Sequence, residues 1–286
     1  MKKSIKFSIA AGLSLIALGS LAACGNSSSK ESNSSSAKKT EIVIAADGST
    51  KPFEYSDSQG NLTGYDIAVA KAVFKELPQY EVKFQTVDFS GITPGITSGR
   101  YQMGANDFGW SKERAQSFNF SSPISKSQNA VAVKSGSYSN FASLAGKKTI
   151  GNPSSNYSKE IEAWNQAHPD KKIDISYASD QTSINTRLNQ IDTGKIDFML
   201  YDKISLTQAV KEQGFDDLKV QSVDTTSGDP EHDGYEYFIF GQDKLGEQLK
   251  KDVDGELKKL QADGTLSKLS KEYFGGDFVP KAELFK

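Results

Sequence analysis

The sequence predicts an α/β fold, because short β-branched segments alternate with segments of helical periodicity along most of the chain. Residues 41–47 (EIVIAAD) are apolar and β-branched and predict the first strand. Residues 65–78 (YDIAVAKAVFKELP) carry apolar side chains at helical spacing and stop at a proline, so they predict a helix. Residues 81–88 (EVKFQTVD) alternate as a strand does, and residues 91–100 (GITPGITSGR) indicate a short helix.

The same alternation continues through the second half of the chain. Strands are expected at residues 129–134, 147–152, 172–178, 196–202, 218–224 and 235–240. Helices are expected between them, at residues 157–167, 183–194 and 203–214. Residues 243–275 are expected to be helical, because Leu245, Leu249, Val253, Leu257 and Leu260 recur on one face.

The N-terminus has the layout of a secretory signal peptide. Three lysines within the first six residues precede an apolar run at residues 7–21, which is shorter than the roughly 20 residues of a membrane span. A membrane-anchor helix is the alternative. The sequence around Cys24, Leu21-Ala22-Ala23-Cys24, resembles the lipobox of bacterial lipoproteins, in which the signal is cut before a cysteine that carries lipid. We therefore expect residues 1–23 to be a signal peptide and Cys24 to anchor the chain at the extracellular face of the cell membrane.

The segment that follows Cys24 is polar and of low complexity. Residues 24–39 offer too little apolar surface to offset the entropy of ordering, so they predict a flexible tether, and the folded part is expected to begin near Thr40. The 286-residue chain carries 34 basic and 36 acidic residues and no basic stretch interleaved with aromatics, so we expect no nucleic-acid partner. With 2 histidines and 1 cysteine, the sequence predicts no His/Cys metal site. We also expect no cofactor, and we expect the protein to be a monomer.

Three motifs, in order along the chain, resemble those of the polar amino-acid-binding lipoproteins of ABC importers, the bacterial extracellular solute-binding proteins of family 3. They are KPFEYSDSQGNLTGYDIAVAKAV (51–73), SKERAQSFNFSSP (111–123) and IDFMLYD (196–202). The resemblance spans residues 41–280. It implies a protein without enzyme activity that captures a polar amino acid or small sulfur-containing peptide and delivers it to a membrane permease.

The resemblance also implies a two-lobed periplasmic-binding-protein-like fold of type II, in which each lobe is a mixed β-sheet flanked by helices and the ligand binds between the lobes. Lobe 1 would comprise residues 40–130 plus 237–286, and lobe 2 residues 131–236. The two crossings between the lobes would lie near residues 129–134 and 235–240. A hinge there would absorb rotation at a few residues.

Arg114 is the residue on which the expected site depends. A planar guanidinium can hold a carboxylate through two hydrogen bonds, and the resemblance assigns Arg114 to the ligand's α-carboxylate. A surface ion pair with Glu113 or Asp107 is the alternative. Ser111 is expected to offer its hydroxyl and backbone N–H to the ligand, or to act as a helix N-cap, and both roles can hold together.

Further residues are assigned by the resemblance. Asp202 is expected to pair with the ligand's ammonium, and it can also cap the following helix. Asp107 and Gly109 match positions that meet the ammonium or the carboxylate. Ser155 and Asn156 match the GTNYE turn of cystine-binding members, from which the sequence departs by having Ser154 in place of glycine.

The first strand end also departs from the family pattern. Where many members have an aromatic wall, this chain has DGSTKPF (47–53), with a threonine in place of the tyrosine and Lys51 before the proline. A lost wall and a gained cation favour a larger or more anionic ligand. We therefore expect glutathione first, cystine next and another polar amino acid third, with Lys51 or Lys203 as a second cation. Phe53 or Trp110 could stack on the ligand or simply pack in the core, and Asp47 is expected to face the cleft.

Two other classes of function remain open at this point. An enzyme on the same fold, such as a dehydratase-like protein, would need a general acid or base that faces the substrate. Glu54 and Asp47 are the carboxylates that the sequence offers for that role, besides Asp202. A surface adhesin or sensor would need an exposed aromatic patch, repeats or a receptor, and the sequence shows neither repeats nor such a patch.

Overall fold

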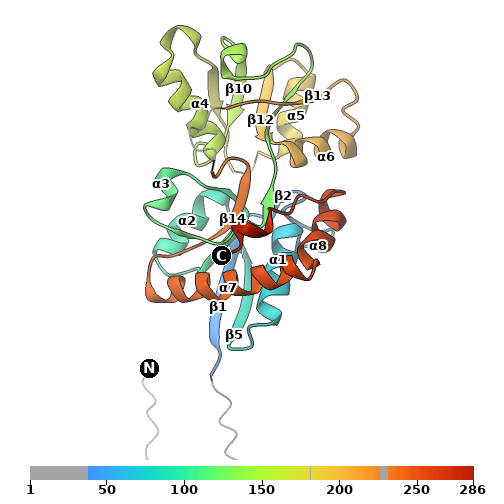
Figure 1. Cartoon of the computed structure of the whole chain (residues 1–286). Coiled ribbons are helices and arrows are strands. Elements are labelled where there is room, and N and C mark those ends of the chain that lie inside the picture. The colour runs from blue at the N-terminus through green and yellow to red at the C-terminus, as the bar shows by residue number, and fades with distance from the viewer. Residues whose placement is uncertain (1–37, 181, 226–230) are drawn as a thin grey trace, which may run out of the picture. The chain divides into compact units, whose positions relative to one another are not determined.

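The computed structural model describes residues 38–180, 182–225 and 231–286. Residues 38–286 form one compact unit, and within it the elements build two α/β lobes (Figure 1). The first strand begins at Thr40. The expected signal peptide, Cys24 and most of the tether lie outside the described residues.

The larger sheet, in lobe 1, joins the N-terminal strands to a strand from much later in the chain. Its order is β5-β1-β6-β14-β7, with β8 also paired to β14. The strands are β1 (Thr40–Ala46), β5 (Tyr80–Thr86), β6 (Met103–Gly109), β7 (Asn119–Phe120), β8 (Ser125–Lys126) and β14 (Tyr235–Phe240). β1 runs parallel to β5 and β6, whereas β14 runs antiparallel to β6.

Helices cover both faces of this sheet because its strands are apolar on both faces. Ile42 and Ile44 pack with α1 (Tyr65–Lys75), α7 (Lys244–Ala262) and α8 (Thr265–Phe274). Ala45, on the other face, packs with α2 (Phe89–Thr97). Lobe 1 also contains the small sheet β2-β3-β4 (Ser49–Thr50, Glu54–Ser56, Leu62–Thr63), the short helix α3 (Lys112–Ala115) and the 3₁₀ turn η3 (Ala282–Leu284).

Lobe 2 has a three-stranded antiparallel sheet and a separate parallel pair. The sheet order is β12-β9-β13, and the pair is β10-β11. The strands are β9 (Asn129–Val133), β10 (Lys148–Gly151), β11 (Asp174–Tyr177), β12 (Phe198–Asp202) and β13 (Lys219–Ser222). The helices are α4 (Asn156–Ala167), α5 (Ile184–Asp192) and α6 (Lys203–Gln213), with 3₁₀ turns η1 (Phe141–Leu144) and η2 (Pro169–Lys171).

The alternation of β9 explains how lobe 2 packs. Ala130 and Ala132 face a core that includes residues of α5 and α6, whereas Val131 and Val133 face a core that includes α4 and η1. Strand pairing places all of β9 in the lobe 2 sheet and all of β14 in the lobe 1 sheet. The chain therefore passes between the lobes at residues 127–128 and again between β13 and β14 (Figure 1).

The expected strands and helices occur, but the sequence predicted neither β6 nor α3 nor the short strands β2, β3, β4, β7 and β8. Two of the expected helices also differ in extent. The helix expected at residues 91–100 begins earlier, at Phe89. The long helical region near the C-terminus is two helices, because Gly264, in a left-handed conformation with φ 82°, separates α7 from α8. In the part of the chain that the structure describes, no helix has the length and apolar character that a membrane span requires.

Candidate ligand-binding site

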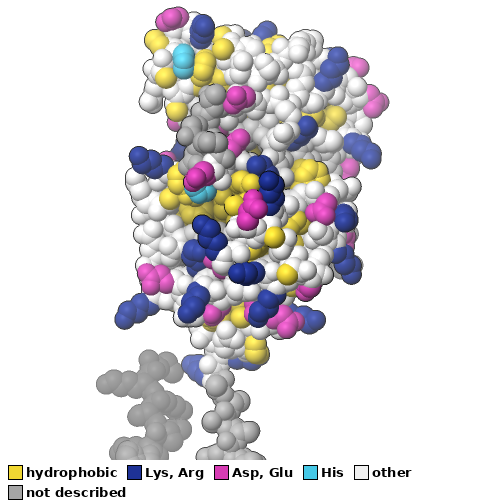
Figure 2. Space-filling view, in the orientation of Figure 1, with side chains coloured by type: hydrophobic (Ala, Val, Ile, Leu, Met, Phe, Trp, Pro, Cys, Tyr) yellow, Lys and Arg dark blue, Asp and Glu magenta, His cyan; other side chains and the backbone are white. Residues whose placement is uncertain are grey.

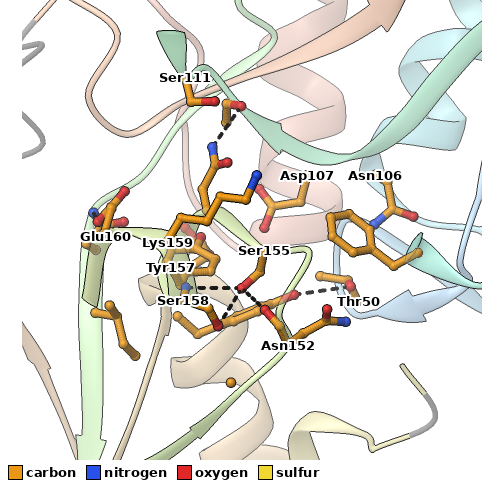
Figure 3. Close-up of a pocket in the computed structure, with 18 of the residues that line it drawn as sticks. Thr50, Asn106, Asp107, Ser111, Asn152, Ser155, Tyr157, Ser158, Lys159 and Glu160 are labelled. Carbon is orange, nitrogen blue, oxygen red and sulfur yellow. Dashed lines mark hydrogen bonds between the residues drawn. The ribbon is translucent and has the colours of Figure 1, made fainter. Parts of the chain in front are cut away.

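A pocket of about 460 Å³ lies between the two lobes. Lobe 1 contributes side chains from β6 and α3, and lobe 2 contributes side chains from α4, α5 and β12. Figure 3 shows Asn106 and Asp107 of β6 on one side of this pocket and Asn152, Ser155 and Tyr157 on the other. The volume is in the range of small-molecule binding sites.

Most of the residues that the sequence assigned to the site line this one pocket. Those that do are Asp47, Asp107, Gly109, Trp110, Ser111, Arg114, Ser155, Asn156 and Asp202. Lys51 and Phe53 do not line it. Residues that are up to 155 positions apart in sequence therefore meet at one place.

Arg114 is held at the lobe 1 side of the pocket by α3. The Ser111 hydroxyl caps this helix by accepting a hydrogen bond from the Arg114 backbone N–H at 3.2 Å. The guanidinium donates from Nη1 to the Gly109 carbonyl at 2.9 Å and lies 5.1 Å from the centroid of the Phe108 ring. Burial lowers the pKa of Arg114 to about 10, so the side chain stays cationic at neutral pH.

The ion-pair alternative for Arg114 is not what the structure shows. Among the described residues Arg114 forms no salt bridge, and Glu113 pairs instead with Lys159 at 2.6 Å. Arg114 Nη2 reaches across to lobe 2 and donates to the Ser154 carbonyl at 3.5 Å. The guanidinium is therefore a fixed cation at the pocket, and no carboxylate of the described residues forms a salt bridge with it.

The N-terminus of α4 faces the same end of the pocket. Ser155 is its N-cap: the hydroxyl accepts from the Ser158 backbone N–H at 3.2 Å and donates to the Asn152 carbonyl at 2.9 Å (Figure 3). The first amides of a helix lack an intrahelical acceptor and carry a partial positive charge. Those of Asn156 and Tyr157 thus give lobe 2 an anion-binding surface beside Arg114.

Among the carboxyl groups that line the pocket, Asp107 comes from lobe 1 and Asp202 from lobe 2. Asp107 in β6 keeps its carboxyl oxygen Oδ2 buried without a hydrogen-bond partner among the described residues. Asp202 ends β12 and caps α6, because its Oδ1 accepts from the Ser205 backbone N–H at 2.9 Å. Burial raises the pKa of Asp202 to about 6. Burial, and next the Asp202 carboxylate, raise the pKa of Asp107 well above its usual range.

The backbone of Asp107 is unusual for a strand residue. Its φ is 45°, a value that residues other than glycine rarely adopt, and the β6–β14 register shifts between Tyr237 and Ile239 opposite it. Strained residues and β-bulges gather at functional sites, where they redirect a side chain. The bulge at β6 accounts for how an aspartate in an otherwise buried strand comes to line the pocket.

Further contacts cross the pocket from lobe to lobe. Asn156 donates from Nδ2 to the Gly109 carbonyl at 3.2 Å. The Thr50 hydroxyl lies 3.3 Å from the Tyr201 hydroxyl. Trp110 stacks on His232, with 4.2 Å between the ring centroids, so one face of this indole is covered by the protein itself.

Three of the assigned residues have partners within the protein, namely Lys51, Phe53 and Asp47. Lys51 pairs with Glu212 of α6 at 2.8 Å. Phe53 is 0% exposed and packs against Phe274, with 4.8 Å between the ring centroids. Asp47 lines the pocket, but its Oδ1 already accepts from the Ser49 backbone N–H at 2.7 Å.

The structure also brings to the pocket residues that the sequence analysis did not assign. They include Thr50, Asn106, Tyr157, Glu160, Arg187 and Tyr201. Burial raises the pKa of Glu160 to about 7. A signal existed for Arg187, because it falls three residues after Ile184 and four before Ile191, on the apolar face of α5. None existed for Asn106, because the sequence predicted no strand over β6, where Asn106 lies next to Asp107.

A metal site requires a cluster of ligand side chains, and a surface for a highly charged partner requires charges of one sign gathered in a patch. Among the described residues, no group of three or more His, Cys, Asp or Glu side chains is placed to hold a metal ion. On the face drawn in Figure 2, basic and acidic side chains are interspersed rather than gathered in a patch of one sign.

Comparison with known proteins identifies the family of the chain. The model of the bacterial extracellular solute-binding proteins, family 3, matches residues 42–276. The chain is 31% identical over 252 residues to the L-cystine-binding protein TcyJ of Bacillus subtilis (strain 168), a match that covers 87% of this chain and 89% of that protein.

Solved structures resemble the chain over nearly their whole length. One comes from work on glutathione import in Gram-positive bacteria via GshT and the cystine ABC importer TcyBC of Streptococcus mutans. It has a TM-score of 0.79 and 34% identity, and it covers 86% of this chain and 99% of that one. Another, a putative L-cystine ABC transporter from Listeria monocytogenes, has a TM-score of 0.73 and 28% identity and covers 84% and 98%.

The chain belongs to the bacterial extracellular solute-binding proteins of family 3. It has the two-lobed fold of periplasmic-binding-protein type II, as expected from the sequence. It is accordingly a solute-binding protein of the kind that serves ABC importers outside the cytoplasmic membrane.

Proposed function

We propose that this protein captures a compound that carries an amino-acid zwitterion, with cystine and glutathione as the preferred candidates, and passes it to a membrane permease. The protein acts by binding and not by catalysis. Residues 1–23 direct export, the lipid on Cys24 holds the protein at the outer face of the membrane, and residues 24–39 are the tether. The tether keeps the lobes at high effective concentration near the permease.

The observation that carries this proposal is the arrangement of charge in the pocket. Arg114 and the N-terminus of α4 together suit a carboxylate, and Asp107 and Asp202 together suit an ammonium. An α-amino acid carries both groups on one carbon. Each group would contact both lobes, so the ligand would stabilise the closed arrangement by its differential affinity for it.

The remaining named residues have supporting roles. Ser111 and Ser155 cap the helices that present Arg114 and the α4 amides. The Gly109 carbonyl orients both Arg114 and Asn156. The lobes are proposed to divide at the two crossings, and the unit works as a monomer because both halves of the site come from one chain.

Cystine and glutathione are favoured for two reasons. The relatives with these ligands in their names or titles match most of the chain. In addition, a pocket of about 460 Å³ is larger than a single small amino acid needs. An enzyme on this fold is disfavoured because the pocket carboxyls Asp202 and Asp47 accept from backbone amides, which suits fixed structural and binding roles.

A thermal-shift screen of residues 38–286 tests the proposal. The panel contains cystine, reduced and oxidised glutathione, and the single amino acids, each with wild type and Arg114→Ala. A ligand at about 100 times its dissociation constant adds roughly 2.7 kcal/mol to the free energy of unfolding. We expect a shift with cystine or glutathione that Arg114→Ala abolishes. A folded wild type that responds to no amino acid or peptide would refute the proposal.

A further inference from the structure

Arg187 is a second arginine in the same pocket, and the proposed function does not use it. The chain has three arginines, Arg100, Arg114 and Arg187, and the last two line the pocket. Among the described residues Arg187 forms no salt bridge, and its buried Nε has no hydrogen-bond partner. A guanidinium has five N–H donors and is costly to bury unpaired, so its position in the pocket needs an explanation.

The geometry separates the two arginines by a pair of aromatic rings. The Arg187 guanidinium lies 5.6 Å from the centroid of the Tyr201 ring. The Tyr201 ring lies 4.9 Å from the Tyr157 ring. Tyr157 lies in the first turn of α4, close to Ser154, whose carbonyl accepts from Arg114 Nη2 at 3.5 Å. The pocket therefore has a cation at each end of a two-tyrosine wall.

Tyr201 is itself held in place, so the wall has a defined orientation. Its hydroxyl lies 3.3 Å from the Thr50 hydroxyl, across the lobe boundary. The two lysines that the sequence offered as a second cation are engaged elsewhere. Lys51 pairs with Glu212 at 2.8 Å, and Lys203 Nζ donates to the Gln128 side chain at 3.3 Å.

Nearby acidic groups do not neutralise Arg187. Asp47 is the carboxylate that interacts with it electrostatically, but Asp47 Oδ1 accepts from Ser49 and forms no salt bridge with Arg187. Asp180 Oδ2 accepts from the Ser90 backbone N–H at 3.2 Å. The guanidinium thus keeps its donors available to a ligand.

We propose that Arg187 binds a second carboxylate and that the ligand carries a carboxylate at each end, joined by a spacer that lies along Tyr157 and Tyr201. This inference rests on the proposed function, in which Arg114 takes the first carboxylate. A sulfur-containing spacer suits the tyrosine wall, because sulfur makes favourable contacts with aromatic rings. The substrate class is therefore a dicarboxylate amino acid or peptide, and Arg187 determines the preference for it.

The experiment uses pairs of probes that differ by one carboxylate. One pair is glutathione and its glycine ethyl ester, and the other is cystine and cystine monomethyl ester. Dissociation constants are measured by calorimetry for residues 38–286 as wild type, Arg187→Gln, Arg114→Gln and Arg100→Gln. Arg100 is exposed and outside the pocket, so its substitution is the matched control for the loss of one arginine charge.

We expect wild type to prefer the dicarboxylate member of a pair. Arg187→Gln should raise the dissociation constant of the dicarboxylate member about 10- to 100-fold, which equals about 1.4 to 2.8 kcal/mol at 1.4 kcal/mol per factor of ten. The dissociation constant of the monocarboxylate member should stay within about twofold of the wild-type value. Arg114→Gln should raise the dissociation constants of both members, and Arg100→Gln should change neither. Thermal melts of each ligand-free variant show whether the variant folds.

Three results would overturn the inference. If Arg187→Gln weakens both members of a pair equally, Arg187 has only a structural role, and the proposed function stands. If wild type binds single amino acids and neither dicarboxylate, the inference is wrong and the proposed function survives for another ligand. If folded wild type binds no probe and no amino acid, both are wrong.

Discussion

Lys51 Nζ lies 2.8 Å from Glu212 Oε2, and this ion pair joins the loop after β2 in lobe 1 to α6 in lobe 2. A second ion pair, between Lys159 and Glu113 at 2.6 Å, also crosses from lobe to lobe. Both pairs form only when the lobes approach each other. They stabilise the closed arrangement. Lys51 and Glu212 do not line the pocket, whereas Lys159 and Glu113 do.

Substitution of Lys51 by alanine should therefore raise the dissociation constant of every ligand by the same modest factor. Exposed ion pairs contribute about 0.2–1 kcal/mol, so we expect a 1.5- to 5-fold rise in the dissociation constant. Calorimetry with two ligands of different charge measures this factor. Glu212→Gln should have the same effect, and the double variant should add little to it. A loss that affects an anionic ligand alone would instead make Lys51 a ligand-binding residue.

Asp202 combines two roles that a pair of substitutions can separate. Asparagine caps helices about as well as aspartate, so Asp202→Asn should keep the cap on α6 while removing the charge. We expect Asp202→Asn to weaken a zwitterionic ligand about 10- to 100-fold without lowering the free energy of unfolding. Asp202→Ala should also lose about 1 kcal/mol of stability. Chemical denaturation and calorimetry measure the two effects. Equal stability of the two variants would contradict the capping role.

The dissociation constant should depend on pH through the same residue. Burial raises the pKa of Asp202 to about 6, above the roughly 3.9 of an unfolded chain, so the folded state favours the protonated carboxyl. The contribution of this group to the free energy of unfolding is therefore full below about pH 4 and is lost as pH rises through 6. A bound ammonium favours the ionised form, so the complex holds fewer protons than the free protein. Affinity should therefore rise by up to about tenfold per pH unit toward pH 6 and level off above about pH 7.

Calorimetry in two buffers of different ionisation enthalpy provides the check on this pH dependence. Protons should be released on binding at pH 5.5 and far fewer at pH 8. Asp202→Asn should reduce the release at pH 5.5. A proton count that is the same in wild type and Asp202→Asn would show that another group, such as Asp107 or Glu160, accounts for the pH dependence.

The sequence located much of the pocket because its motifs fall at the ends of regular elements. Arg114 and Asp202 follow strands, and each lies in a helix or at its start, where a local pattern reveals a cap. The sequence did not identify Arg187 and Tyr201 as pocket residues, because a residue in a helix or strand can face the core or a pocket with the same periodicity. For Tyr201, the contact of its hydroxyl with Thr50 of lobe 1 shows that the side chain faces the pocket. Lys51 was assigned from its charge at a place where the chain departs from the family pattern, and neither reveals a partner 161 positions away.

Phe53 is the residue whose role follows most directly from the fold. It is 0% exposed, its ring lies 4.8 Å from that of Phe274, and it does not line the pocket. Phe53→Ala should lower the free energy of unfolding by about 3–5 kcal/mol, because it removes a buried ring and leaves a cavity. Among molecules that remain folded, the dissociation constant should change by less than about threefold. Denaturant unfolding and calorimetry at low temperature measure both quantities. A large loss of affinity with little loss of stability would show that the ring contacts the ligand.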